Sequence, residues 1–129
     1  MKPLLCFDIE ATGTDVAKDR IVQIAFCEVC DDPFDSGTAM MFNARNLLIN
    51  PGMPIPKEAT DIHGITNDDV YGSPSFDDCS LVLHDRFKGV DLVGFNLSNF
   101  DVPMLWEEFH RAGIEWDLTG VKIIDAGIL

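Results

Sequence analysis

The sequence predicts an α/β domain with one mixed sheet, in which three antiparallel strands are followed by parallel strands and helices flank the sheet. Three apolar segments before residue 50 are joined by short polar connections, a pattern typical of an antiparallel meander. Two segments after residue 75 carry apolar residues at helical spacing, with a short apolar strand between them. Because a helix precedes that strand, we expect it to run parallel to the first strand.

The first predicted strand is the apolar run Pro3–Phe7, and the two acidic residues Asp8 and Glu10 follow it directly. Side chains two positions apart on a strand share one face and lie about 6 to 7 Å apart along the chain. Two ionised carboxylates near a core repel each other, and burying them is costly unless a positive charge compensates them. We therefore expect Asp8 and Glu10 to bind a divalent metal ion together.

The next two strands complete the predicted meander. The small and polar residues 11–19 indicate a loop, and residues 20–30 indicate the second strand. Residues 31–37 supply a turn, and residues 38–42 begin a third strand that we expect to continue through 47–49. The early part of the chain is thus predicted to be antiparallel.

Residues 50–75 differ in composition from the preceding strands, because prolines and glycines interrupt their apolar residues. We expect a long irregular region there, with short helices at most near residues 57–62 and 67–71. Long structured loops in compact domains are often functional, which makes this region a candidate part of a binding site.

Helical spacing in the last third of the chain predicts two longer helices. The first runs from residue 76 to a stop at Gly89, and the second runs over 99–112 to a stop at Gly113. A strand over 91–95 separates them, and a last strand begins at 121–124. The apolar stripe of the second helix comprises Val102, Leu105, Trp106 and Phe109.

A third carboxylate, Asp101, is expected in the first turn of the second long helix. Ser98 stands three residues before it, which is close to a capping-box pattern. Ligands tend to bind at the carboxyl ends of strands in α/β sheets, so Asp101 comes near Asp8 and Glu10 if strand 91–95 lies beside the first strand. The alternative is that Asp101 only supplies a favourable charge at the start of a helix.

Composition limits the function classes. The chain has 129 residues, 47% of them hydrophobic, and a net charge of −13, which predicts one domain over 1–129 without a broad basic surface for long nucleic acid. The charge still allows a site that holds the last nucleotides of a strand through metal ions. Cys27 and Cys30 are expected on opposite faces of a strand and lack a second pair, so all four cysteines are expected to be free thiols. The expected setting is cytoplasmic, with no membrane association.

Four motifs follow one another along the chain. They are Asp-Ile-Glu-Ala-Thr-Gly-Thr at 8–14, Arg-Ile-Val-Gln-Ile at 20–24, a proline-rich stretch at 51–66 that ends in Ile-His-Gly-Ile-Thr, and Asn-x-x-x-Phe-Asp at 96–101. In this order and spacing they resemble the DEDD 3'-5' exonuclease family. Within it, the chain is most similar to the branch that contains the proofreading exonuclease subunit of bacterial DNA polymerase III and ribonuclease T. The resemblance implies a ribonuclease-H-like fold and a part in DNA replication and proofreading.

The resemblance also implies roles for particular residues. Asp8, Glu10 and Asp101 would be the catalytic carboxylates that hold two Mg²⁺ or Mn²⁺ ions, which suits the preference of these cations for oxygen ligands. Thr12 and its backbone would hold the terminal 3' hydroxyl, and Asn96 would support the site through a hydrogen bond. Substrate contacts would come from Ile9, Ala11, Thr12, Gly13, Ile62, His63, Asn96 and Phe100. The alternatives are a turn residue before Gly64 for His63 and ordinary core packing for Ile62 and Phe100.

The family carries a third motif, His-x-x-x-x-Asp, on a later helix, where it supplies the general base and a fourth carboxylate. This motif does not occur between Asp125 and Leu129. His84 and His110 are expected to be exposed surface residues rather than substitutes for it. We therefore expect an exonuclease domain truncated before its third motif, with little or no nuclease activity as 129 residues and with self-association through an uncovered edge.

Three functions are weighed on this basis. The first is hydrolysis of terminal phosphodiesters of single-stranded DNA or RNA from the 3' end by two metal ions. The second is a non-catalytic module on the same fold that binds a nucleic-acid end or a DNA polymerase subunit. The third is a haloacid-dehalogenase-like phosphatase, since residues 8–14 superficially resemble its Asp-x-Asp-x-Thr start, although Glu10 replaces the second Asp.

Overall fold

The computed structural model describes residues 4–125, which form a five-stranded mixed sheet of order β3-β2-β1-β4-β5. The first three strands are antiparallel to one another, and β4 and β5 run parallel to β1 and β4. The α/β class, the meander and the parallel strands are therefore confirmed, while Pro3 lies outside the described residues. The strands are β1 (Leu4–Ala11), β2 (Ile21–Asp31), β3 (Ala39–Leu48), β4 (Asp91–Gly94) and β5 (Ile123–Asp125).

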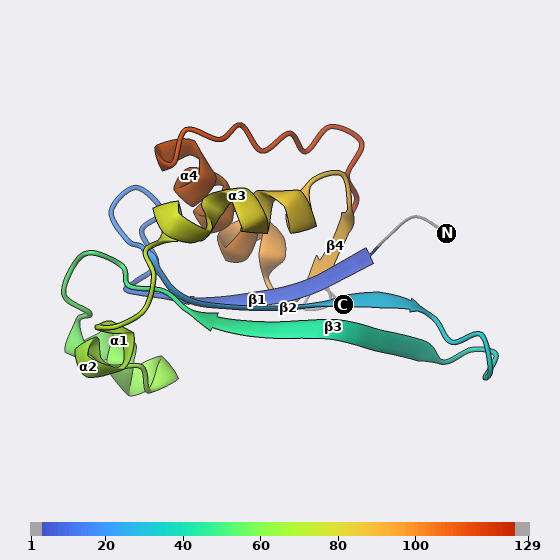
Figure 1. Cartoon of the computed structure of the whole chain (residues 1–129), viewed down its shortest axis with the longest axis horizontal. Helices are drawn as coiled ribbons and strands as arrows, with labels where there is room; N and C mark the ends of the chain where they lie inside the picture. The colour runs from blue at the N-terminus through green and yellow to red at the C-terminus, as the bar shows by residue number, and fades with distance from the viewer. Residues whose placement is uncertain (1–3, 126–129) are drawn as a thin grey trace.

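Helices cover one face of this sheet and one end of its antiparallel part. In Figure 1, α3 and α4 lie on the same face of the sheet, while α1 and α2 lie beyond the end of β3. The ranges of α1, α2 and α3 lie close to those predicted, whereas α4 begins later than predicted. The helices are α1 (Lys57–His63), α2 (Asn67–Val70), α3 (Phe76–Phe87), the short π-helical turn η1 (Leu97–Asp101) and α4 (Val102–Arg111).

The core lies between the sheet and the α3–α4 layer. The ring of Phe87 on α3 packs edge-on against Phe7 of β1 at 5.2 Å and against Phe26 of β2 at 5.4 Å. Trp116, which follows α4, belongs to the same cluster and packs edge-on against Phe87 at 6.1 Å. Burial of these large aromatic side chains fixes β1 as the central strand on which α3 rests.

The start of α4 differs from the prediction. The chain makes the π-helical turn η1 first, and α4 then begins at Val102, with no side-chain cap from Ser98 or Asp101. The capping box predicted there is therefore wrong, because the Asp101 carboxylate bonds to a different strand. Trp106, predicted in the buried stripe, is 36% exposed and stacks on the exposed His110.

His84 is another partial correction. It was predicted to be an exposed surface residue, but it is half-buried because its ring packs edge-on against Phe109 at 5.6 Å. The four cysteines are free thiols, as expected. Within residues 4–125, none of the helices combines the length and the apolar character that crossing a bilayer requires.

Gly94, the last residue of β4, is where the sheet and η1 approach most closely. A methyl group there would lie 2.7 Å from the carbonyl oxygen of Phe7 and 2.8 Å from the side chain of Leu97. We expect Gly94→Ala to lower the free energy of unfolding by about 1 to 3 kcal/mol in a denaturant titration, because backbone and core must shift to make room. Gly72→Ala is the matched control, since a methyl group at Gly72 meets nothing within 4 Å. Equal stability of the two variants would contradict this packing.

Candidate functional site

The alternation of β1 places Asp8 and Glu10 on the face of the sheet opposite the core. Phe7 and Ile9 are buried on the helix-covered side, while Asp8 is exposed and Glu10 is half-buried. The prediction that the two carboxylates share one face is confirmed. Their position at the end of β1 brings them next to the point where β1 and β4 separate.

Asp101 reaches β1 from the start of α4. Pairing of β4 with β1 extends only to Cys6 and Val93, so β4 offers no partner to the backbone amide of Ile9 farther along β1. The Asp101 carboxylate takes that place, accepting a hydrogen bond of 3.1 Å from the Ile9 N–H. A buried backbone donor is thereby satisfied. The same bond holds Asp101, which is only 3% exposed, at the backbone between Asp8 and Glu10.

The three carboxylates interact electrostatically. Burial raises the pKa of Asp101 to about 7, against the lowering effect of the Ile9 hydrogen bond, and the charges of Asp8, Glu10 and Asp125 raise it further. Burial and the charge of Asp8 also raise the pKa of Glu10, while His63 acts in the opposite direction. Such mutual repulsion is a cost that a bound cation relieves.

The donor chemistry of this cluster fits a hard divalent cation such as Mg²⁺ or Mn²⁺, since carboxylate oxygens are the ligands that these ions prefer. With the side chains where they stand, residues 4–125 contain no group of three or more His, Cys, Asp or Glu side chains close enough to hold an ion. Asp8 is the exposed member of the three carboxylates, whereas Glu10 is half-buried and Asp101 is buried.

A pocket of about 190 Å³ adjoins Glu10 at the end of β1. Ile62 at its rim is 85% exposed, so core packing does not explain this residue, whereas Phe100 is half-buried against the main core. The pocket brings together residues of β1, the loop after it, α1 and η1. Its lining comprises Glu10, Ala11, Gly13, Thr14, Ala59, Ile62, His63 and Phe100.

His63 holds α1 against the end of β1. Its Nδ1 accepts a hydrogen bond of 3.0 Å from the Ile65 N–H, so its Nε2–H donates to the Ala11 carbonyl oxygen at 3.0 Å. The chain turns at Gly64, whose φ of 77° suits glycine, so the turn interpretation of His63 also holds. A single side chain thus forms the turn and positions the pocket wall.

The loop after β1 is closed by Thr12, which is buried although the resemblance gives it a substrate contact. Its hydroxyl donates to the Asp19 carboxylate at 2.8 Å and accepts from the Arg20 N–H at 3.1 Å. A Cβ at Gly13 would collide with that same carboxylate of Asp19. Thr12, Gly13 and Asp19 therefore form one interlocked turn.

A buried ion-pair network supports this turn from behind. Glu108 on α4, only 2% exposed, accepts hydrogen bonds from the Ile21 N–H and from the side chains of Arg20 and Arg111. Arg111 also donates to the carbonyl oxygens of Val16 and Asp19 in the loop. Sequence reasoning missed this network, although a glutamate on the apolar side of a helix, next to Phe109, was a usable signal.

Asn96 lies at the carboxyl end of β4 but does not line the pocket. Its φ of 54° is left-handed, and its N–H donates to the Asp125 carboxylate at 2.7 Å. The side-chain oxygen of Asn96 accepts a hydrogen bond from Asn99 at 3.2 Å. Ile9, another predicted substrate contact, has a buried side chain, so only its backbone faces Asp101.

Solved structures share this fold. The apo structure of exonuclease I superposes with a TM-score of 0.80 at 20% identity over 97% of this chain and 29% of that chain. A zinc-ion-bound complex of Escherichia coli exonuclease I with single-stranded DNA superposes with a TM-score of 0.81 at 21% identity over 97% of this chain and 28% of that chain. At these identities the likeness shows the fold, a mixed sheet of the ribonuclease-H-like exonuclease type.

Curated relatives are closer in sequence. A DNA polymerase III subunit epsilon-like protein of Rhodobacter capsulatus is 34% identical over 112 residues, which are 86% of this chain and 15% of the relative. The DNA polymerase III subunit epsilon of Buchnera aphidicola subsp. Schizaphis graminum is 31% identical over 111 residues, 82% of this chain and 45% of the relative. The chain thus spans less than half the length of either relative.

The family model tests the resemblance most directly, because it covers almost the whole sequence. The exonuclease model RNase_T matches residues 5–128, a range that contains all three carboxylates and every residue of the pocket described above. The chain belongs to the RNase T exonuclease family.

Proposed function

We propose that residues 1–129 form a 3'-5' exonuclease domain that binds the 3' end of single-stranded nucleic acid and hydrolyses its terminal phosphodiester with two divalent metal ions. The observation that carries this proposal is the hydrogen bond from the Ile9 N–H to Asp101, which sets a third carboxylate between Asp8 and Glu10. Relatives named as DNA polymerase III epsilon support a role in replication proofreading and a polymerase partner.

In this proposal Asp8, Glu10 and Asp101 hold Mg²⁺ or Mn²⁺. When bound, the ions supply an activated water and stabilise the charge on the leaving oxygen. The chain's own contribution is to gather negative oxygens at one end of β1 and to hold Asp101 there through a backbone bond. Burial and repulsion raise the pKa of Asp101 to about 7, so cation binding at neutral pH should release the proton that this carboxyl group partly retains.

The pocket beside Glu10 is the proposed seat of the terminal nucleotide. Its exposed Ile62 and half-buried Phe100 offer apolar surface to a base and sugar. Gly13 has no side chain, so the backbone of the loop can come close to the bound nucleotide. His63 and Ala11 form the wall between α1 and β1. The Thr12 hydroxyl is already used by Asp19 and Arg20, so we propose that Thr12 shapes the backbone around the 3' hydroxyl rather than binding it through its own hydroxyl.

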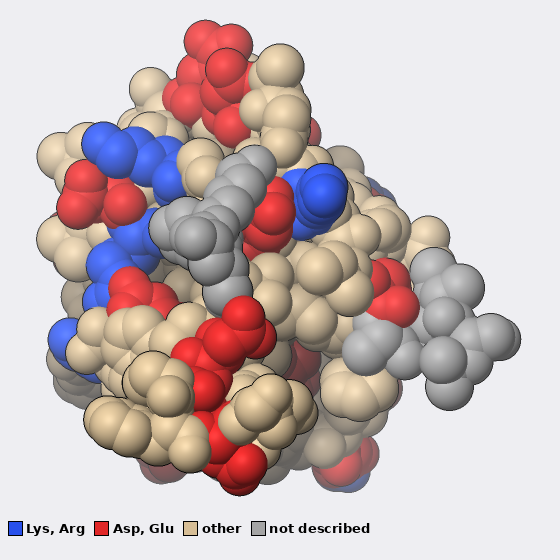
Figure 2. All heavy atoms as spheres, turned by 90° about the vertical axis from the view of Figure 1, so that its right-hand side faces the viewer, with Lys and Arg blue, Asp and Glu red and all other residues tan. Residues whose placement is uncertain are grey.

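Surface charge supports recognition of an end rather than of a long strand. Figure 2 shows the end of the molecule opposite to α1 and α2, where acidic and basic side chains are interspersed. A chain of net charge −13 gains little from neutralising many phosphates. Binding through metal ions at one terminal linkage is consistent with this distribution. The hydrogen bond from the Asn96 N–H to the Asp125 carboxylate joins the residues that follow β4 to the end of β5.

The test is anisotropy of a 5'-labelled single-stranded oligonucleotide with a phosphorothioate at its last linkage. We expect the dissociation constant to rise at least about tenfold when Mn²⁺ is replaced by chelator, which corresponds to about 1.4 kcal/mol. Asp8→Asn should remove the Mn²⁺ dependence, while Asp85→Asn, on the exposed side of α3, is the matched control. With an unmodified oligonucleotide, little hydrolysis is expected of these 129 residues, and any shortening of the labelled strand should proceed stepwise from its 3' end.

A non-catalytic module that binds a nucleic-acid end or a polymerase subunit is the second candidate, because the described side chains do not form a ready metal group. That module would bind the same oligonucleotide equally well in Mn²⁺ and in chelator. Equal affinity in both conditions, unchanged in Asp8→Asn, would reject the metal-dependent exonuclease in favour of this module. Release of the labelled 5' nucleotide as the first product would reject the 3'-5' direction.

A further inference from the structure

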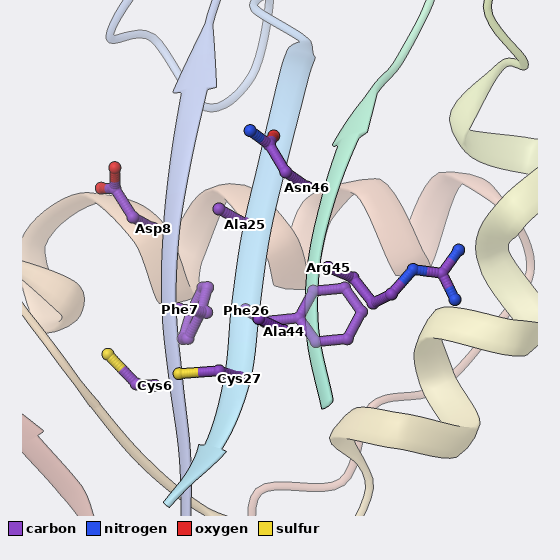
Figure 3. A pocket seen from close by; sticks show the side chains of 9 residues that line it. All are labelled: Cys6, Phe7, Asp8, Ala25, Phe26, Cys27, Ala44, Arg45 and Asn46. Atoms are coloured by element: carbon purple, nitrogen blue, oxygen red, sulfur yellow. The ribbon is translucent and has the colours of Figure 1, made fainter. Parts of the chain in front are cut away.

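A second cavity lies on the open face of the sheet, away from the pocket beside His63. It has a volume of about 390 Å³ and extends across β1, β2 and β3. Figure 3 shows Asp8 and Cys6 on the same side of β1, with Ala25 and Cys27 beside them on β2. Two half-buried thiols therefore line one groove that opens to solvent.

Cys6 and Cys27 are direct cross-strand partners in the β1–β2 pairing. Opposed residues of antiparallel strands have Cα atoms about 4.5 to 5.5 Å apart, which lies within the roughly 4.4 to 6.8 Å range of disulfides. In Figure 3 the side chain of Cys27 extends toward the strand that carries Cys6, and the two thiols are close enough to interact electrostatically. Opposed cysteines in this register fall within the Cα separation that a disulfide can bridge.

The other two cysteines do not compete for this pairing. Cys30 stands three residues beyond Cys27 on β2 and pairs with Met40 of β3. Cys79 lies on α3, which covers the opposite face of the sheet. Sequence spacing suggests Cys30 as the partner of Cys27. The cross-strand register instead places Cys27 beside Cys6.

We propose that Cys6 and Cys27 form a dithiol modification site that a peroxide oxidises to a cross-strand disulfide. The Cys27 thiol loses its proton and attacks a peroxide oxygen, the O–O bond breaks, and the Cys27 sulfur becomes a sulfenic acid as the first water leaves. The second thiol attacks that sulfur, the S–S bond forms and the S–O bond breaks, and a second water leaves. Two thiols and one hydrogen peroxide thus give one disulfide and two waters.

The disulfide would tie β2 to the strand that bears Asp8 and Glu10. A bond that is partly exposed on a sheet face is accessible to small reductants, so the modification is reversible. The same pair suits a trivalent arsenical, which condenses with two neighbouring thiols and does not require oxidation. These properties follow from the position of the two thiols and do not depend on the proposed nuclease function.

The test uses the purified chain treated with hydrogen peroxide, then labelled with N-ethylmaleimide under denaturing conditions and weighed by mass spectrometry. Reduced protein should take up four labels, one for each cysteine, and oxidised protein two fewer, with dithiothreitol restoring them. Peptide mapping should show a Cys6–Cys27 link. The variant with Cys30→Ser and Cys79→Ser should still form it within one chain, and phenylarsine oxide should block two labels in that variant.

Cys6→Ser and Cys27→Ser are the decisive variants, and circular dichroism confirms that each is folded. Each should lose the peroxide-induced link and the protection by phenylarsine oxide. Full labelling of the wild-type chain after excess peroxide would overturn the proposal. It would be overturned equally by a link between Cys27 and Cys30, by the same loss of labels in Cys6→Ser, or by disulfides formed only between chains.

Discussion

Asp101→Asn is expected to raise the free energy of unfolding at pH 8, in chelator, by about 2 to 4 kcal/mol. The wild-type carboxylate is ionised at this pH although it is 3% exposed and faces two other carboxylates. Asparagine has nearly the same shape, and its side-chain oxygen can still accept the hydrogen bond from the Ile9 N–H. The variant therefore loses an unfavourable charge without losing the bond that places the side chain. In the absence of a cation, the ionised Asp101 carboxylate is therefore expected to lower the free energy of unfolding.

The pH dependence of this effect has a definite sign. The pKa of Asp101 is about 7 in the folded chain, above its ordinary value of 3.8. Between these two values the folded state retains a proton that the unfolded state has lost, so wild-type stability falls as pH rises through this window. Denaturant titrations at pH 4, 6 and 8 should show the variant's advantage opening across this range and then staying constant. A wild-type protein more stable at pH 8 than Asp101→Asn would contradict the assignment of a repulsive carboxylate cluster.

Glu108→Ala is expected to have the opposite effect and to cost about 1 to 3 kcal/mol, the range for leaving a buried hydrogen-bonding group without its partner. Its carboxylate is 2% exposed and accepts from Arg20, Arg111 and the Ile21 N–H. Removing it leaves a buried backbone donor and two cations without their shared acceptor. The loop that Arg111 holds at Val16 and Asp19 should loosen as well, which thermal unfolding and hydrogen exchange of residues 12–20 both measure.

Glu107→Ala is the matched control, since Glu107 is the neighbouring residue on α4 and has the same chemistry with greater exposure. Glu108→Gln should fall between the two, because the amide retains one acceptor oxygen but loses the charge. A Glu108→Ala chain as stable as Glu107→Ala would show that the network does not hold the loop. The comparison separates loss of the buried acceptor from a general loss of negative charge on the helix.

Much of the fold was predictable because its signals are local. The apolar runs of β1 and β2, the spacing of Phe76, Leu83 and Phe87, and Gly89 with φ of 69° mark elements close to where the structure has them. The parallel pairing of β4 with β1 followed from the helix that precedes it. Asp8, Glu10 and Asp101 were brought together by the same inference, since β4 ends beside them.

The remaining features depend on partners far apart in the sequence. The capping interpretation of Asp101 was wrong because the Ile9 N–H lacks a β4 partner, and the carboxylate satisfies that donor instead. Trp106 fits a helical stripe by spacing, yet it is 36% exposed and stacks on His110 of the same helix. The pairing of Cys6 with Cys27 depends on register, which sequence spacing does not show.

Calorimetric titration of Mn²⁺ into the apo chain at pH 7 tests the central claim, that Asp8, Glu10 and Asp101 form one cation site. The account predicts saturable binding with proton release, weakened at least about tenfold in Asp101→Asn and in Asp8→Asn, and unchanged in Asp85→Asn. Performing the titration in two buffers of different ionisation enthalpy gives the number of protons released. Binding of equal strength in the wild type and in both site variants, or no binding by the wild type, would contradict it.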